Sequence, residues 1–159
     1  MAIQLVEKHE SIRERVRTKE WEARVELAAG HRVLAHYGVN DMTYNHFAMR
    51  VPGEPDHMLV KRTAWMFAAV TASSLLKTDF EGNVVGSDDV KKIRGGALII
   101  HAGLLKGRPD LNATLHTHTP NVMGFAHINS ACYRSTSTPC GSMASCGITT
   151  LPGSSSIPR

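Results

Sequence analysis

The sequence of 159 residues lacks any hydrophobic run near the ~18 residues that a membrane-spanning helix needs. Charged residues among its first ten positions also interrupt the apolar core that a secretory signal requires. Cysteine is scarce and late: its three residues, Cys132, Cys140 and Cys146, are too few and too oddly numbered to indicate a disulfide framework. These absences predict a cytoplasmic protein without a membrane partner.

Acidic residues are missing from the C-terminal part, since none follows Asp110, and this contributes to the net charge of +4. The remaining basic residues alternate with acidic ones and form no basic stripe, so we expect no nucleic-acid partner. Hydrophobic residues make up 42% of the chain and charged residues 20%, a balance typical of a globular protein. A single domain of this length can bury about 70% of its unfolded surface.

Composition divides the chain into two unequal parts. Residues 1–128 have the mixed patterning of an α/β domain. In residues 129–159, Ser, Thr, Cys, Gly and Pro supply 21 of 31 positions, and no apolar periodicity remains. We therefore predict a partial domain over 1–128 followed by an irregular, low-complexity tail over 129–159.

Local signals predict the elements of the first part. Ser11 followed by Glu14 is a capping-box pattern, and Gly38 is a natural helix end, so one long helix is expected between them. Alternating and apolar runs bounded by turn residues indicate the other elements. The predicted helices cover 12–36, 96–107 and 121–128, and the predicted strands cover 44–51, 58–61, 75–78, 84–85 and 112–118.

Two histidines, His116 and His118, stand at the end of the last predicted strand. Side chains in an extended chain repeat every second residue, so both imidazoles should lie on one face, with their Cα atoms about 6.6 Å apart. Two such rings can bind one cation at Zn–N distances of about 2.0–2.1 Å. The alternative interpretation is a pair of polar residues at an exposed strand end.

Three segments, in unbroken order, carry a resemblance to a known family. They are Y-N-H-F-A-M-R-V-P-G-E-P from Tyr44, T-A-S-S-L with K-T-D-F-E-G-N from Thr71, and H-A-G-L-L-K-G-R-P-D-L-N-A-T-L-H-T-H-T-P from His101. Together these segments resemble the class II aldolase/adducin family, and the resemblance extends over residues 20–128.

The resemblance implies a three-layer α/β/α sandwich with a central, mostly antiparallel sheet. Enzymes of this family hold one divalent metal ion, usually Zn²⁺, with three histidines and cleave a carbon–carbon bond of a small hydroxy-carbonyl or sugar-phosphate substrate. His116 and His118 match two of the metal ligands, and Asn45, Ser73 and Ser74 are implied as substrate-binding residues. Family members are commonly homo-oligomers.

The chain departs from the family pattern in three places. Ala97 occupies the position of the aldolases' catalytic Glu, so no catalytic residue is assigned. The loop at 59–64 lacks the usual Pro and Gly, and no segment matches the third histidine ligand. The composition break near Ser130 falls where the family continues, which predicts a truncated or frame-shifted, incomplete C-terminal region.

Three functional hypotheses follow. The first is a class II aldolase-like lyase with a partial zinc site, whose activity is doubtful because of Ala97 and the missing ligand. The second is a non-catalytic binding or scaffold module like the adducin head, and the third is a fragment without a function of its own. His101 is interpreted as a helix–sheet packing or outer-shell residue, and His46 as a strand histidine satisfied within the fold.

Overall fold

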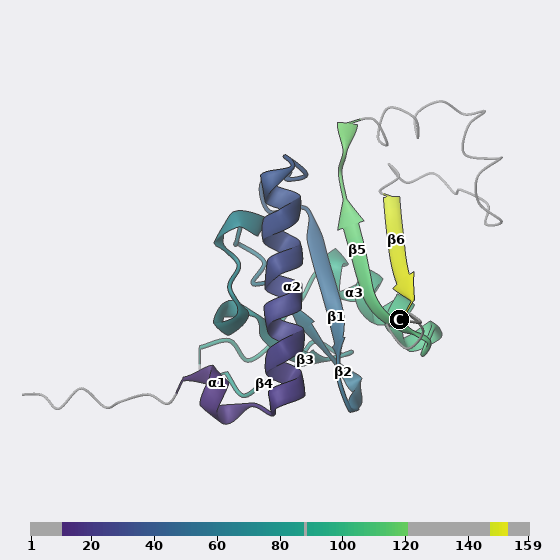
Figure 1. The fold of residues 1–159 in the computed structure, drawn as a ribbon. Coiled ribbons are helices and arrows are strands. Elements are labelled where there is room, and N and C mark those ends of the chain that lie inside the picture. The colour runs from purple at the N-terminus through teal and green to yellow at the C-terminus, as the bar shows by residue number, and fades with distance from the viewer. Residues whose placement is uncertain (1–10, 88, 121–146, 153–159) are drawn as a thin grey trace, which may run out of the picture.

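The structure, a computed structural model, describes residues 11–87, 89–120 and 147–152. Its centre is a six-stranded sheet with the strand order β4-β3-β2-β1-β5-β6, in which every neighbouring pair is antiparallel (Figure 1). The strands are β1 (His46–Val51), β2 (Glu54–Val60), β3 (Leu76–Asp79), β4 (Val84–Val85), β5 (Leu111–Thr117) and β6 (Gly147–Pro152).

Two hairpins connect successive strands of the predicted set. β1 and β2 are joined by a tighter turn than expected, because Gly53 adopts a φ of 77° and allows Glu54 to pair with Val51. Between β3 and β4, the Asp79 carboxylate accepts hydrogen bonds from the backbone N–H groups of Glu81 and Asn83. The turn residues therefore fix both hairpins locally, as their sequences indicate.

In the part of the chain that the structure describes, three helices accompany the sheet: α1 (Ile12–Arg15), α2 (Thr18–His36) and α3 (Gly96–Gly107). The capping box at Ser11 is confirmed. The single helix predicted over 12–36 is wrong, because Val16 is extended and a new helix begins after Arg17. Arg17 forms an ion pair with Glu54 of β2, a contact across 37 residues that helical periodicity alone could not reveal.

Helices cover both faces of the sheet. One apolar core packs α2 against Phe47, Leu59 and other strand residues, and a second packs α3 against Ala48 and Met58. Neighbouring residues of one strand thus serve opposite cores, as the two-residue repeat requires. The three-layer α/β/α sandwich with an antiparallel sheet is confirmed, with α2 and α3 as its outer layers (Figure 1).

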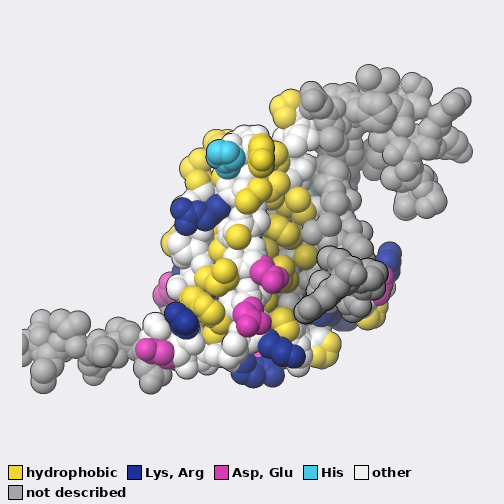
Figure 2. Space-filling view, viewed as in Figure 1, with side chains coloured by type: hydrophobic (Ala, Val, Ile, Leu, Met, Phe, Trp, Pro, Cys, Tyr) yellow, Lys and Arg dark blue, Asp and Glu magenta, His cyan; other side chains and the backbone are white. Residues whose placement is uncertain are grey.

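Two short 3₁₀ turns, η1 (Phe67–Ala69) and η2 (Ala72–Ser74), lie between β2 and β3 and contact α2. Buried charges fasten α2 to this region. Glu20 accepts hydrogen bonds from Arg24 (2.9 Å) and from Lys77 of β3 (2.9 Å), while Arg24 also donates to the Leu75 carbonyl (2.7 Å). On the outer surface of α2, hydrophobic side chains remain exposed, among them Val25 and Val33 (Figure 2).

The C-terminal part differs from the expectation in one respect. Residues Gly147–Pro152 form β6, which pairs with the whole length of β5, where irregular backbone was predicted. A strand can form there because Ile148 to Leu151 is a short β-branched and apolar run. The predicted helix over 121–128 and the three cysteines lie outside the described residues. The division of the chain at residue 128 therefore stays a prediction. No helix of the described part is long and apolar enough to cross a bilayer.

Candidate metal site

Four histidines from four places in the chain meet on the α3 side of the sheet. His46 begins β1, His101 lies on α3, His116 lies near the end of β5, and His118 follows β5 directly. The antiparallel pairing of β1 with β5 sets His46 opposite His116. The sheet register therefore gathers side chains that are 70 residues apart in sequence.

His116 and His118 point toward each other. Their Nε2 atoms lie 3.0 Å apart, close to the separation of about 3.3 Å for two tetrahedral ligands at Zn–N distances of 2.0–2.1 Å. The Nδ1 atom of His118 lies 2.8 Å from a carboxylate oxygen of Asp41. His116 is buried, and its Nδ1 has no hydrogen-bond partner within the described part of the chain. The expected placement of both rings on one face is thus what the structure shows.

The other two histidines form a separate chain of hydrogen bonds. Nδ1 of His46 lies 2.7 Å from Nε2 of His101, whose Nδ1 lies 2.6 Å from the Thr114 hydroxyl of β5. The His46 ring also stacks on His116, with centroids 4.2 Å apart and planes only 5° from parallel. Parallel stacked rings do not aim nitrogens at a common point, so His46 supports His116 from the side. His101 connects α3 to β5 from a fully buried position, consistent with its interpretation as a packing residue.

Burial favours the neutral form of three of these imidazoles, those of His46, His101 and His116. Desolvation, followed by the neighbouring histidines, lowers the pKa of His46 to about 3. The same cause lowers the pKa of His101 to about 3, and burial followed by the charge of His118 lowers the pKa of His116. A histidine must be neutral to bind a metal ion, so burial prepares His116 electrostatically for that role.

The donor set fits part of a metal site. Two imidazole nitrogens are correctly spaced, and a carboxylate orients one of the rings, as is common around metal-binding histidines. Within residues 11–87, 89–120 and 147–152, however, no group of three or more His, Cys, Asp or Glu residues could hold a metal ion together. The pair therefore amounts to two thirds of the three-histidine set that the resemblance implies.

The predicted substrate-binding residues lie in different places. Asn45 is buried beside the histidines, where its Oδ1 accepts the backbone N–H of His118 (2.9 Å) and its amide nitrogen donates to the Val39 carbonyl (3.3 Å). Ser74 is buried and closes the η2 turn through Thr71. Ser73 is exposed on the same turn, which packs against α2 in the layer opposite α3. Their substrate-binding role stays a prediction.

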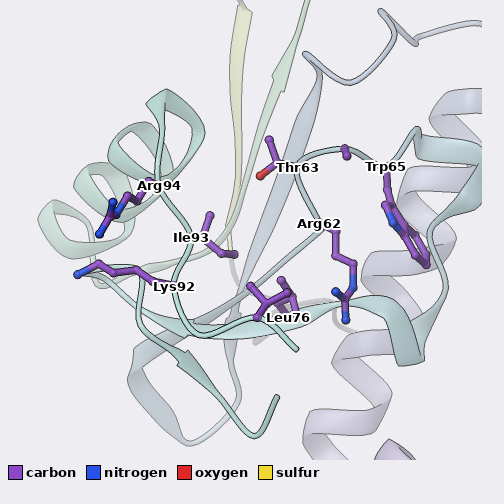
Figure 3. A pocket seen from close by; sticks show the side chains of 9 residues that line it. Arg62, Thr63, Trp65, Leu76, Lys92, Ile93 and Arg94 are labelled. Carbon is purple, nitrogen blue, oxygen red and sulfur yellow. The ribbon is translucent and has the colours of Figure 1, made fainter. Parts of the chain in front are cut away.

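The altered loop after β2 lines a cavity of about 330 Å³ at the β3–β4 side of the sheet (Figure 3). Thr63 and Ile93 face each other across it, while the side chains of Lys92 and Arg94 extend away from Thr63. Arg62 is neutralised by a two-point contact with Asp89. The cavity thus presents no convergent set of charges.

Lys61, at the start of the same loop, is buried, and its charge acts on His46 of the histidine cluster. Its ammonium donates to the Thr43 carbonyl (3.1 Å) and to the Thr63 carbonyl (3.3 Å), and burial lowers its pKa. Its charge contributes to the lowered pKa of His46. Lys61 therefore joins the chain before β1 to the loop after β2.

Sequence reasoning missed two residues that hold this site together. Asp41 contacts His118 across 77 residues, and Thr114 contacts His101 across 13. Neither contact has a local pattern, because the first depends on the antiparallel pairing of β1 with β5 and the second on the packing of α3 against β5. A carboxylate shortly before a strand that pairs with the H-x-H strand is the only signal that could have pointed to Asp41.

The structure is thus a three-layer α/β/α sandwich with an antiparallel sheet and a histidine pair at the end of a central strand. Residues 25–154 match the model of the "Class II Aldolase and Adducin N-terminal domain" family. The chain belongs to the class II aldolase/adducin family, as its motifs predicted.

Individual relatives agree. The chain is 37% identical to the "Putative aldolase class 2 protein" of Caulobacter vibrioides over 69% of its length and 42% of the relative's. It is 34% identical to alpha-adducin of Rattus norvegicus over 61% of its length and 13% of the relative's. The chain thus spans less than half the length of these curated relatives.

Solved structures show the same fold. An aldolase II superfamily protein from Pseudomonas syringae superposes with a TM-score of 0.71 and 37% identity, over 76% of this chain and 48% of the other. The L-fuculose 1-phosphate aldolase of Glaciozyma antarctica superposes with a TM-score of 0.62 and 26% identity, over 67% of this chain and 44% of the other.

Proposed function

We propose that this chain carries an aldolase-type metal site, in which His116 and His118 hold a divalent cation, Zn²⁺ by preference, for cleavage of a carbon–carbon bond in a small hydroxy-carbonyl or sugar-phosphate substrate. The observation that carries the proposal is the 3.0 Å approach of the two Nε2 atoms. Family membership and the likeness to an L-fuculose 1-phosphate aldolase support it.

A bound cation would supply Lewis-acid stabilisation of the negative charge that develops on such a substrate as the bond breaks. The chain's own residues provide the setting. Burial keeps His116 neutral, Asp41 and Asn45 fix His118, and the His46 ring supports His116 from the side. Two protein ligands leave further coordination positions open, which an incoming substrate requires.

One observation favours a second function. Ala97 lies in the first turn of α3, where the family's aldolases place their catalytic Glu, and an alanine cannot transfer a proton. Adducins are among the relatives. The alternative is therefore a non-catalytic, adducin-like binding or scaffold module that retains the fold and part of the metal site.

A retro-aldol assay separates the two functions. The purified chain is incubated with Zn²⁺ and a panel of ketose phosphates and hydroxy-carbonyl compounds, with and without a chelator, beside the His116→Ala variant. Cleavage that the chelator and the variant both abolish supports the lyase. Zinc binding without cleavage of any compound, together with a slow gain of cleavage in Ala97→Glu, supports the non-catalytic module.

We also propose that the protein is cytoplasmic and homo-oligomeric, and that it binds neither membranes nor nucleic acids. Exposed hydrophobic side chains favour self-association, since Val33 is 54% and Tyr37 is 76% exposed. Sedimentation equilibrium over a range of concentrations tests this part, and a monomer at all concentrations would contradict it.

A further inference from the structure

We propose that Asp41 is a positioning residue that fixes the tautomer of His118, so that Nε2 of this ring is unprotonated and directed at His116. The segment that contains Asp41 also sets the backbone of His118. This inference concerns the metal-free protein, and it rests on the proposed function only where a cation is added.

The first step is the contact between the carboxylate and the ring. An Asp41 oxygen lies 2.8 Å from Nδ1 of His118. An ionised carboxylate can only accept hydrogen bonds, so the hydrogen between the two atoms belongs to Nδ1. In a neutral imidazole the other nitrogen is then bare, and here that nitrogen is Nε2.

The second step is the contact between the two rings. The Nε2 atoms of His116 and His118 are within hydrogen-bonding distance, and a hydrogen bond needs one proton between them. Because Asp41 leaves Nε2 of a neutral His118 bare, the proton is then carried by Nε2 of His116. Nδ1 of His116 is then bare as well, and this buried atom is the one without a partner in the described part of the chain. A buried nitrogen without a proton is a smaller penalty than a buried N–H without an acceptor.

The third step is the backbone that presents Asp41. Tyr44 donates its N–H to the Asp41 carbonyl (2.8 Å), which closes a turn around Met42. Met42 has a φ of 41°, in the left-handed region that non-glycine residues avoid. Such strain persists only where the surroundings enforce it, and it concentrates at functional sites.

The same short segment fixes His118 from other directions. The Asn45 side chain accepts the His118 backbone N–H, and the Tyr44 ring lies nearly parallel to the His118 ring, at 14° and 6.2 Å between centroids. His118 lies beyond the end of β5 and has no strand pairing of its own. Residues 41–45 therefore replace the missing sheet contacts and determine where Nε2 points.

The test reads the tautomer directly. Long-range ¹H–¹⁵N correlation spectra of the metal-free, ¹⁵N-labelled chain distinguish a protonated Nδ1 from a protonated Nε2. We expect His118 to carry its proton on Nδ1 and His116 on Nε2. In Asp41→Ala the Nε2-protonated form of His118 becomes populated, whereas Asp41→Asn, which keeps an oxygen acceptor, gives an intermediate result. Asp110→Asn, an exposed acid paired with Arg108, serves as the matched control and leaves the spectrum unchanged.

Zn²⁺ titration gives a second readout on the same proteins. Loss of a carboxylate that orients a ligand histidine typically lowers metal affinity 10–100-fold, so we expect that loss in Asp41→Ala, a smaller one in Asp41→Asn and none in Asp110→Asn. A wild-type His118 protonated on Nε2, or a tautomer that Asp41→Ala leaves unchanged, would overturn the inference. The spectrum of the wild-type chain decides even if a variant does not fold. The spectrum is recorded without metal or substrate, so a failed retro-aldol assay would not affect its outcome.

Discussion

His31 gives this fold a calculable sensitivity to acid. The ring is fully buried on α2, between Phe47 and Phe67, at centroid distances of 5.6 and 4.7 Å. Its Nδ1 lies 2.7 Å from the Leu27 carbonyl, and its Nε2 has no partner in the described residues. Burial is the largest cause that lowers the pKa of His31 to about 4, and the charge of Lys61 adds to it.

The sign and size follow from linkage between protonation and folding. In the unfolded chain His31 takes up a proton near its ordinary pKa of about 6.5, whereas the folded protein resists protonation down to about 4. The free energy of unfolding therefore falls as the pH drops below 6.5 and levels off below 4, after a total loss of about 3 kcal/mol from this one residue. Between pH 7 and pH 5 the loss is about 2 kcal/mol.

Urea denaturation at pH 7, 6 and 5, with a chelator present throughout, measures this term. In His31→Leu, which keeps the volume and removes the titrating group, stability should fall by about 2 kcal/mol less between pH 7 and pH 5 than in the wild type. His36→Gln, at an exposed position on the same helix, should follow the wild type. His46 cancels in the comparison, because His31 does not contribute to its lowered pKa, and His31 is only the smallest cause of the lowered pKa of His101. Parallel pH profiles for wild type and His31→Leu would refute the reasoning.

Two further predictions concern stability. Arg24→Met leaves the Leu75 carbonyl and part of the Glu20 charge unpaired in the interior. It should therefore lower the free energy of unfolding, measured by urea denaturation, by about 3–5 kcal/mol. A loss below about 1 kcal/mol would show that the buried network is unimportant. Gly82→Ala would bring a Cβ within 2.4 Å of the Ile93 carbonyl oxygen at a φ of 86°. It should therefore lower the melting temperature more than Gly86→Ala, which has a φ of 72° but open space around it, by the equivalent of about 1–3 kcal/mol of overpacking; equal effects would contradict this.

Much of the fold could be predicted because its signals are local. The capping box of Ser11 and Glu14, the glycine turn at Gly53 and the apolar run of α3 each determine structure within a few residues. The break between α1 and α2 could not be predicted in this way, because no Gly or Pro marks it, and the ion pair of Arg17 with Glu54 that accompanies it joins residues far apart in sequence. The strand β6 was missed for a similar reason: a short apolar run becomes a strand only where a partner such as β5 offers its edge.

Part of the candidate site could likewise be predicted from local signals, and the rest depends on tertiary contacts. The H-x-H spacing alone put His116 and His118 on one face, because the side-chain repeat of an extended chain is fixed by geometry. The surrounding contacts from His46, His101 and Asp41 come from other elements and appear only when β1 pairs with β5 and α3 packs on the sheet. Sequence motifs thus identified the histidine pair, and the tertiary structure supplied the groups that orient its two rings.

Zn²⁺ binding by the histidine pair is the central claim, and isothermal titration of the metal-free chain measures it most directly. The account predicts one Zn²⁺ per chain in the wild type, loss of that binding in both His116→Ala and His118→Ala, and unchanged binding in His57→Ala, whose ring lies on β2 beside Glu54. Wild-type protein that takes up no Zn²⁺, or single variants that bind it as the wild type does, would contradict the account.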